Sequence, residues 1–204
     1  MSMPPINRRN VFISGSAYEY GSFGESGKHF IRDLSRSLLQ NDFKITSGFG
    51  LGVGPYVVEA VLEEICVDKK DNIADRLQVF PFPPGNYHSE EIKKCYRDNI
   101  MARTGIVLFL FGNKLDDISI KESEGMWKEF EVARSNNALV IPVGASGYAS
   151  EKLWRKVFEK YDDYFENREK YSLFEQLGDP ATDAQKLIDL VIRIADQGSA
   201  SLPS

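Results

Sequence analysis

The 204-residue sequence contains few of the residue types that build metal sites and disulfide frameworks. Its two cysteines, Cys66 and Cys95, stand far apart in segments that we expect to be helical, so neither a disulfide framework nor a cysteine-based zinc site is indicated. The two histidines, His29 and His88, are also isolated, and no third ligand accompanies them. We therefore expect no bound metal and, from the cysteine usage, a reducing cytoplasmic location.

An excess of positive charge and long apolar runs are also missing. The net charge of −5 argues against a general attraction to nucleic acid or anionic membranes, whereas a local basic pocket for a small anionic ligand is compatible with it. No segment reaches the ~18 apolar residues that a transmembrane helix needs, and residues 1–10 lack the apolar core of a signal peptide. We expect neither a nucleic-acid nor a membrane partner.

Standard phosphate-binding and catalytic motifs are absent. Within the glycine-rich stretch Ser47–Gly54, the dinucleotide fingerprint fails because Val53 stands where a third glycine is required, and no Gly-Lys-Ser/Thr sequence completes a P-loop. No nucleophile elbow or Cys/His pair is indicated, and Asp116 and Asp117 belong to a stretch that is typical of a solvated loop. The residues themselves favour a binding site over a catalytic one.

The most distinctive stretch that is present is this same glycine-rich segment. Gly48, Gly50, Gly52 and Gly54 alternate with other residues, and an apolar-periodic segment follows. A strand, a glycine turn and a helix N-terminus together make a plausible phosphate cradle, because the backbone N–H groups become accessible to an anion. The alternative is a turn that binds nothing and whose glycines serve close packing.

The hydrophobic pattern predicts strands that alternate with helices. Short apolar runs indicate strands at 11–13, 43–46, 77–80, 105–111 and 138–143. Amphipathic periodicity indicates helices at 25–40, after the glycine turn, at 89–102, at 126–134, around 153–158 and from residue 182 or 183 onwards. We expect a polar loop at 112–124 and assign no structure to 161–170.

This alternation is typical of the α/β class, with a Rossmann-like, doubly wound parallel sheet covered by helices on both faces. The run at 105–111 is expected to be its central strand. We expect a flexible arm at 1–9, a single domain at 10–197 and a disordered tail at 198–204.

In this class ligands bind beyond the carboxyl ends of the strands. That rule selects one rim, made of residues 14–16, the glycine turn, 82–83, 112–114 and 144–146. Positive side chains near the rim that suit phosphates are Arg76, Lys94, Arg97, Arg103 and Lys114. Aromatic candidates for stacking on a base are Tyr20, Phe49 and Phe82, and Glu129 is a candidate for binding ribose hydroxyls. Solvated surface charges and core aromatics are the alternative interpretation of these residues.

Several stretches match one known family in order, from about residue 10 to residue 164. They are Val11–Ala17, Ser47–Gly54, Pro81–Pro83, Tyr96-Arg97, Arg103–Gly105, Phe111–Lys114, Glu129-Phe130, Pro142–Ala145 and Leu153-Trp154. In these stretches the sequence resembles the SLOG superfamily. Within it, the sequence is similar to the C-terminal sensor domain of the NAD-consuming effectors of the bacterial Thoeris anti-phage system.

The resemblance implies a domain that binds a cyclic ADP-ribose isomer, which a TIR-domain partner produces, and that regulates a sirtuin-type NADase. It implies binding rather than catalysis, no cofactor, and a homodimer. Residues expected to wrap the ligand are Ser14, Gly15, Ser16, Phe49, Gly50, Leu51, Gly52 and Val53. Those expected at its phosphates are Arg76, Lys94 and Arg97, and those on its ribose side are Asn113, Lys114 and Glu129.

Two alternatives stay open. A Lonely Guy-type hydrolase of nucleoside monophosphates would use Arg97 and Glu129, which fall near that family's catalytic Arg and Glu, but the Pro-Gly-Gly-x-Gly-Thr phosphate loop is missing after residues 105–111. A scavenger that sequesters the signal would need the same pocket as a sensor. Because the expected SLOG fold fills the 204 residues, we expect the NADase domain to lie in another chain or in a longer form of this one.

Overall fold

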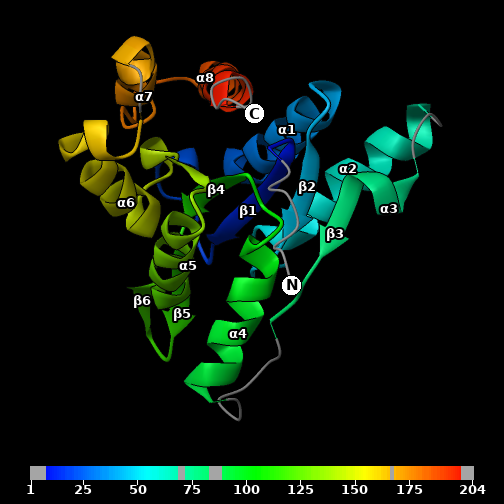
Figure 1. Cartoon of the computed structure of the whole chain (residues 1–204), viewed down its shortest axis with the longest axis horizontal. Helices are drawn as coiled ribbons and strands as arrows, with labels where there is room; N and C mark the ends of the chain where they lie inside the picture. The colour runs from blue at the N-terminus through cyan, green and yellow to red at the C-terminus, as the bar shows by residue number, and fades with distance from the viewer. Residues whose placement is uncertain (1–7, 69–71, 83–88, 166–167, 199–204) are drawn as a thin grey trace.

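The computed structural model describes residues 8–68, 72–82, 89–165 and 168–198 (Figure 1). The arm expected at 1–9 and the tail expected at 198–204 therefore lie mostly outside the described residues, as does Pro83 of the expected rim. The described part forms a parallel sheet with helices on both faces, so the predicted α/β class is confirmed.

The sheet has five strands in the order β3-β2-β1-β4-β7, and every neighbouring pair is parallel. Their bounds are β1 Asn10–Ser16, β2 Lys44–Ser47, β3 Leu77–Val79, β4 Ile106–Phe111 and β7 Leu139–Pro142. The middle position belongs to β1, and the run expected at the centre forms β4, an interior strand between β1 and β7. The strand order reverses between β1 and β4, which is where open α/β sheets bind ligands.

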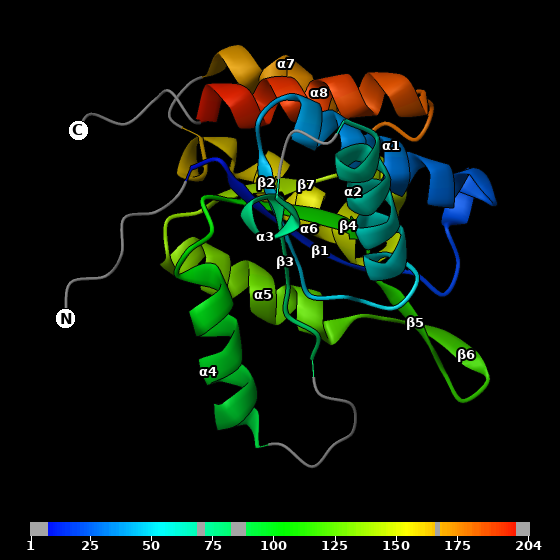
Figure 2. The ribbon, with the colours of Figure 1, turned by 90° about the vertical axis from the view of Figure 1, so that its right-hand side faces the viewer.

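Helices cover both faces of the sheet, as Figure 2 shows from the side. On one face lie α1 (Ser26–Gln40), α2 (Gly54–Asp68) and α8 (Ala184–Gly198), with α1 in contact with both of the others. On the other face α4 (Glu90–Met101) packs beside α5 (Glu124–Ser135). The remaining helices are α3 (Ile73–Arg76), α6 (Tyr148–Glu159) and α7 (Tyr171–Gln176).

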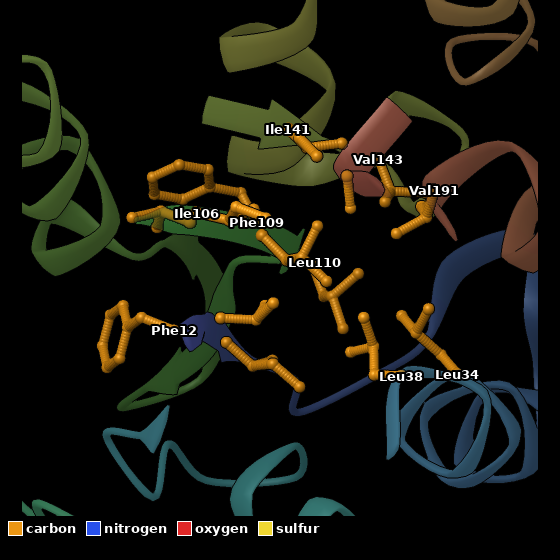
Figure 3. Packing of buried hydrophobic residues seen from close by; sticks show 14 of the residues in the cluster. Phe12, Leu34, Leu38, Ile106, Phe109, Leu110, Ile141, Val143 and Val191 are labelled. Carbon is orange, nitrogen blue, oxygen red and sulfur yellow. The ribbon is translucent and has the colours of Figure 1, made fainter. Parts of the chain in front are cut away.

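The core follows from the periodicity of the sequence. All six residues of β4 are buried, as expected for a strand covered on both faces. Figure 3 shows Leu110 of β4 packed towards Leu34 and Leu38 of α1 and Val191 of α8. Each fully buried aliphatic side chain of this kind contributes about 1.5–3 kcal/mol relative to an exposed one. This packing fixes the carboxyl ends of the strands in space.

One expected loop proved to be a hairpin. Residues 112–124, predicted to be a polar loop, contain the antiparallel strands β5 (Asn113–Asp116) and β6 (Ser119–Glu122). Leu115 and Ile120 lie opposite each other in this pair, and Asp117 at the turn has a φ of 54°. Two four-residue strands with a single apolar pair leave too weak a periodicity to be recognised in the sequence. The hairpin projects from the body in both views (Figures 1 and 2).

The segment left unassigned, 161–170, forms short 3-10 helices at Tyr161–Asp163 and Arg168–Lys170. The Tyr161 and Phe165 rings stack on each other at 4.7 Å, and the Phe165 ring packs at a tilt against Phe174 of α7 at 5.1 Å. Since these contacts join residues that share no regular period, the sequence pattern gave no assignment here.

The last helix was predicted to start from residue 182 or 183. At the start of α8, Asp183 accepts a hydrogen bond from the Lys186 N–H, so Asp183 is the N-cap.

Candidate functional site at the carboxyl ends of the strands

The glycine turn between β2 and α2 lies directly on the end of β1. A Cβ atom on Gly50 would stand 1.9 Å from the carbonyl oxygen of Gly15, and one on Gly52 would stand 1.8 Å from that of Ala17. The Ala17 N–H donates to the Leu51 carbonyl at 2.7 Å. These two glycines therefore serve the close approach of two backbones, which is the packing role left open by the sequence.

The same turn presents two apolar side chains to solvent. Phe49, with a φ of 55°, is 43% exposed, and Leu51 is 73% exposed. Val53 is buried, and its side chain packs beside Gly15. Of the turn residues expected to touch a ligand, Phe49 and Leu51 are thus accessible through their side chains, whereas Val53 belongs to the core.

A serine at the end of β1 binds a carboxylate from α5. The buried Ser14 hydroxyl donates to Glu129 Oε2 at 2.5 Å, although the two residues are 115 positions apart in the chain. Burial raises the pKa of the Glu129 carboxyl, while the Ser14 hydrogen bond and the charge of Arg97 act in the opposite direction. Two expected site residues are thus in direct contact at the strand-order reversal.

A buried guanidinium from α4 lies on the same side of the sheet. Arg97 is 8% exposed, and its guanidinium stacks over the Phe82 ring at 4.9 Å. Phe82 in turn meets Tyr96 edge-on at 4.8 Å, and the Tyr96 hydroxyl donates to the Pro81 carbonyl. In the described part of the chain Arg97 Nε has no hydrogen-bond partner, and Arg97 forms no ion pair. A buried cation without an anionic contact is suited to an anionic ligand.

The rim beyond β4 is held together by hydrogen bonds. The Gly112 N–H donates to the Ser16 carbonyl at 2.9 Å, and the Phe111 N–H donates to Ser146 Oγ at 2.8 Å. A Cβ atom on Gly15 would stand 2.7 Å from the Leu110 carbonyl oxygen, so β1 and β4 are closely packed at their ends. Segments 14–16, 112 and 144–146 therefore meet at one edge, as the sequence predicts. The Ser16 hydroxyl is buried there without a partner among the described residues.

Asn113 and the two lysines expected near the ligand differ in accessibility. Asn113 is 0% exposed and directs its amide to the backbone of Tyr18 and Glu19. Lys114, the next residue of β5, is exposed, and so is Lys94, which lies on α4 one turn before Arg97. Asn113 therefore does not reach the surface of the site, whereas both lysines are accessible to a ligand.

Two of the arginines proposed for phosphate binding lie at the other edge of the sheet. Arg76 immediately precedes β3, donates to the Leu39 carbonyl at the end of α1 and lies near Asp42. Arg103 precedes β4, and its carbonyl accepts a hydrogen bond from Asn10 at the start of β1. Because parallel strands place all their amino ends at one edge, neither residue joins the site at the carboxyl ends. The structure therefore places them away from Arg97 and Glu129, and their proposed contact with the same ligand stays a prediction that this arrangement does not support.

Sequence reasoning missed the loop between β1 and α1, residues 17–24, as part of this edge. The Tyr148 hydroxyl donates to the Glu19 carboxylate, and burial raises the Tyr148 pKa to about 12. The Tyr20 hydroxyl donates to the Gly52 carbonyl at 2.9 Å. Contacts between residues so far apart in the chain have no local sequence pattern, and the sequence singled out only Tyr20 in this loop, as a candidate for stacking on a base.

Among the described residues there is no group of three or more His, Cys, Asp or Glu side chains arranged for a metal ion. No helix among residues 8–68, 72–82, 89–165 and 168–198 has the length and apolarity needed to cross a membrane.

The raised pKa of Glu129 predicts a stability gain for the Glu129→Gln variant. A carboxyl whose pKa is raised by folding stabilises the protein when the pH is below its pKa in the unfolded chain, 4.5. That contribution is lost as the pH rises through its pKa in the folded protein. We therefore expect the variant to exceed wild type by roughly 1 kcal/mol near neutral pH and by less in mild acid, as is common at functional sites. Thermal unfolding of both proteins across this pH range measures the difference.

Glu131→Gln is the matched control, since Glu131 lies on the same helix but is exposed and paired with Lys156 at 2.8 Å. This control should show no gain that grows with pH. A Glu129→Gln variant that is less stable than wild type at neutral pH would mean that the carboxylate is well compensated in the folded protein.

Comparison with known proteins assigns this fold to a family. The sequence model of the Sir2- and TIR-associating SLOG family matches residues 4–198. The chain belongs to this family. The match includes the glycine turn, Arg97 and Glu129, so the site at the carboxyl ends is part of the family's domain and not an appendage to it.

Curated relatives share this domain within longer chains. The chain is 39% identical over 194 residues to the NAD(+) hydrolase ThsA of Bacillus cereus (strain MSX-D12), covering 94% of this chain and 40% of that protein. It is 35% identical to the ThsA of Enterococcus faecium and 36% identical to that of Cytobacillus dafuensis, in each case covering 92% of this chain and 39% of the relative. The chain thus spans about 40% of the length of these relatives.

Proposed function

We propose that this SLOG domain is a sensor that binds a cyclic ADP-ribose isomer and thereby regulates a sirtuin-type NADase in bacterial anti-phage defence. The NADase acts in cis or in trans, the domain acts as a homodimer in the cytoplasm, and a TIR-domain protein produces the ligand. We assign the hydrolase activity named in these relatives to the part of them that this chain does not match, because the chain covers about 40% of their length. The chain's own task is then recognition.

The observation that carries the proposal is the buried guanidinium of Arg97, whose Nε has no hydrogen-bond partner among the described residues, together with the Ser14–Glu129 hydrogen bond. A cyclic ADP-ribose isomer combines a pyrophosphate with ribose hydroxyls. The Arg97 guanidinium suits the phosphate oxygens, and Glu129 Oε1, which Ser14 leaves free, suits a ribose hydroxyl. The accessible Lys94 and Lys114 supply further positive charge at the same edge.

A hydrolase of nucleoside monophosphates is the second candidate, because Glu129 lies at the carboxyl edge beside Ser14 and burial raises the pKa of its carboxyl, the direction that suits a general acid. The course of the chain after β4 argues against it. Gly112 leads into the β5–β6 hairpin, and α5 begins only at Glu124, with a carboxylate in its first turn. A helix N-terminus that holds a substrate phosphate directly behind β4 is therefore absent from the described structure.

Calorimetric titration of the purified protein with cyclic ADP-ribose isomers tests the proposal, with ADP-ribose and AMP as controls. We expect one cyclic isomer to bind more tightly than both controls, and no adenine to appear in the AMP sample by chromatography. Adenine release from AMP, with no cyclic isomer bound, would replace the sensor with the hydrolase. A genomic neighbourhood that encodes a TIR-domain protein and an NADase would distinguish a sensor from a scavenger of the signal.

A further inference from the structure

The loop between β1 and α1 is tied to three other parts of the carboxyl edge. Through Ala17 N–H and the Tyr20 hydroxyl it binds the carbonyls of Leu51 and Gly52 in the glycine turn, at 2.7 and 2.9 Å. Through the Glu19 carboxylate it accepts a hydrogen bond from Tyr148 at the start of α6. Its third attachment is Asn113 at the start of β5, which makes more hydrogen bonds to the loop than any other side chain described above.

The amide of Asn113 matches the backbone of this loop atom by atom. Asn113 Oδ1 accepts from the N–H groups of Tyr18 and Glu19 at 2.9 and 3.1 Å, and Nδ2 donates to the Glu19 carbonyl at 2.9 Å. The two N–H donors fix which end of the amide carries the oxygen. Because the side chain is fully buried, its loss would leave two backbone N–H groups and one carbonyl without their partner.

We propose that Asn113 is a positioning residue of the ligand site, which acts through the β1–α1 loop on the glycine turn and does not touch the ligand. This inference rests on the proposed binding function. The chain of contacts runs from Asn113 to Tyr18 and Glu19, and from the neighbouring Ala17 and Tyr20 to the carbonyls of the glycine turn. This chain of contacts holds the exposed side chains of the turn, Phe49 and Leu51, in the position in which they would contact a ligand.

Three variants separate positioning from general stability. Asn113→Ala removes all three hydrogen bonds, Asn113→Asp retains the acceptor, and Asn136→Ala is the matched control. Asn136 ends α5, and its side chain donates only to the Val132 carbonyl at 2.9 Å among the described residues. We expect Asn113→Ala to weaken binding of the cyclic isomer about tenfold or more. Without ligand, the amides of residues 17–19 and of 53 and 54 should exchange hydrogen faster than in wild type.

The Asn113→Asp variant gives a pH signature that a merely structural role would not produce. A protonated carboxyl can accept from both N–H groups and donate to the Glu19 carbonyl, as the amide does, whereas a carboxylate repels that carbonyl. We expect its affinity to approach the wild-type value as the pH falls from about 8 to about 5, because burial raises the pKa of an introduced carboxyl. The charged neighbours Glu19, Glu122, Lys114 and Lys121 are the same in Asn113→Ala, which serves as the reference.

The outcomes distinguish this inference from the proposed function. If wild type binds no cyclic isomer, the proposed function fails, and the exchange of residues 53 and 54 without ligand still shows whether Asn113 holds the glycine turn. If wild type binds, unchanged affinity of Asn113→Ala overturns the inference. Unchanged hydrogen exchange of the loop and turn amides in Asn113→Ala also overturns it. The same holds if the ligand affinity of Asn113→Asp depends on pH in the same way as that of Asn113→Ala. Where Asn113→Ala does not fold, the comparison of Asn113→Asp with wild type decides.

Discussion

The Arg97→Ala variant is expected to lose ligand binding by roughly 100-fold or more while keeping the fold of wild type. The guanidinium is buried and forms no ion pair among the described residues, although its charge acts on Glu129, so it remains available to contact a phosphate directly. Removing this charge also removes its desolvation cost in the free protein. The free energy of unfolding should therefore change by less than about 1 kcal/mol.

Calorimetric titration and thermal unfolding of the same samples measure the two effects, with Arg103→Ala as the matched control. Arg103 follows the same helix by two residues but lies at the amino ends of the strands. The control should bind the ligand as wild type does. Equal losses in the two variants would indicate general electrostatic attraction, and undiminished binding by Arg97→Ala would remove this residue from the site.

The Gly52→Ala variant is expected to have the largest effect on stability. An added Cβ would stand 1.8 Å from the Ala17 carbonyl oxygen, far inside van der Waals contact, and Gly52 has a φ of 74°. Both sides of this contact are backbone: the glycine turn on one side and the residue that follows β1 on the other. Relief of the clash would therefore displace the glycine turn or the end of β1. We expect a loss of at least about 3 kcal/mol in the free energy of unfolding, measured by denaturant titration.

Gly147→Ala separates the steric clash from the backbone strain. Gly147 has a φ of 77°, close to that of Gly52, but a Cβ there would meet no atom within 4 Å. Its substitution should cost about 1–3 kcal/mol from strain alone. If the two variants are equally stable, the glycine turn yields to the new methyl group, and the close contact between the turn and β1 is not rigid.

The sequence was sufficient to predict the helices and strands that have a strong hydrophobic pattern. Phe30, Ile31, Leu34 and Leu38 recur at helical spacing and are buried on α1. The continuous apolar run of β4 likewise predicted a central strand covered on both faces, and β4 is buried throughout beside the middle strand β1. The hairpin β5–β6 was missed because its strands are short and polar. Such strands form through their mutual backbone pairing, which leaves little side-chain pattern in the sequence.

For the site, the rule that ligands bind at the carboxyl ends of the strands selected segments that do meet at one edge of the sheet, but it could not show which arginines lie there. Arg76 and Arg103 stand just before strands, at the amino edge, and a sequence position between a helix and a strand does not by itself reveal this. The contact between Ser14 and Glu129 joins distant segments, so only the folded sheet brings it into view. Asn113 shows the converse: its position on the rim was predicted, while its burial was not.

A crystal structure of the protein with the cyclic ADP-ribose isomer that binds in calorimetry tests the central claim most directly. We expect the ligand at the carboxyl ends of β1 and β4, with a phosphate at the Arg97 guanidinium and a ribose hydroxyl at the Glu129 carboxylate. A ligand found elsewhere would contradict it. The hollow of about 340 Å³ between α5 and α6, lined by Arg134, Lys156 and Lys160 among others, is one such alternative place.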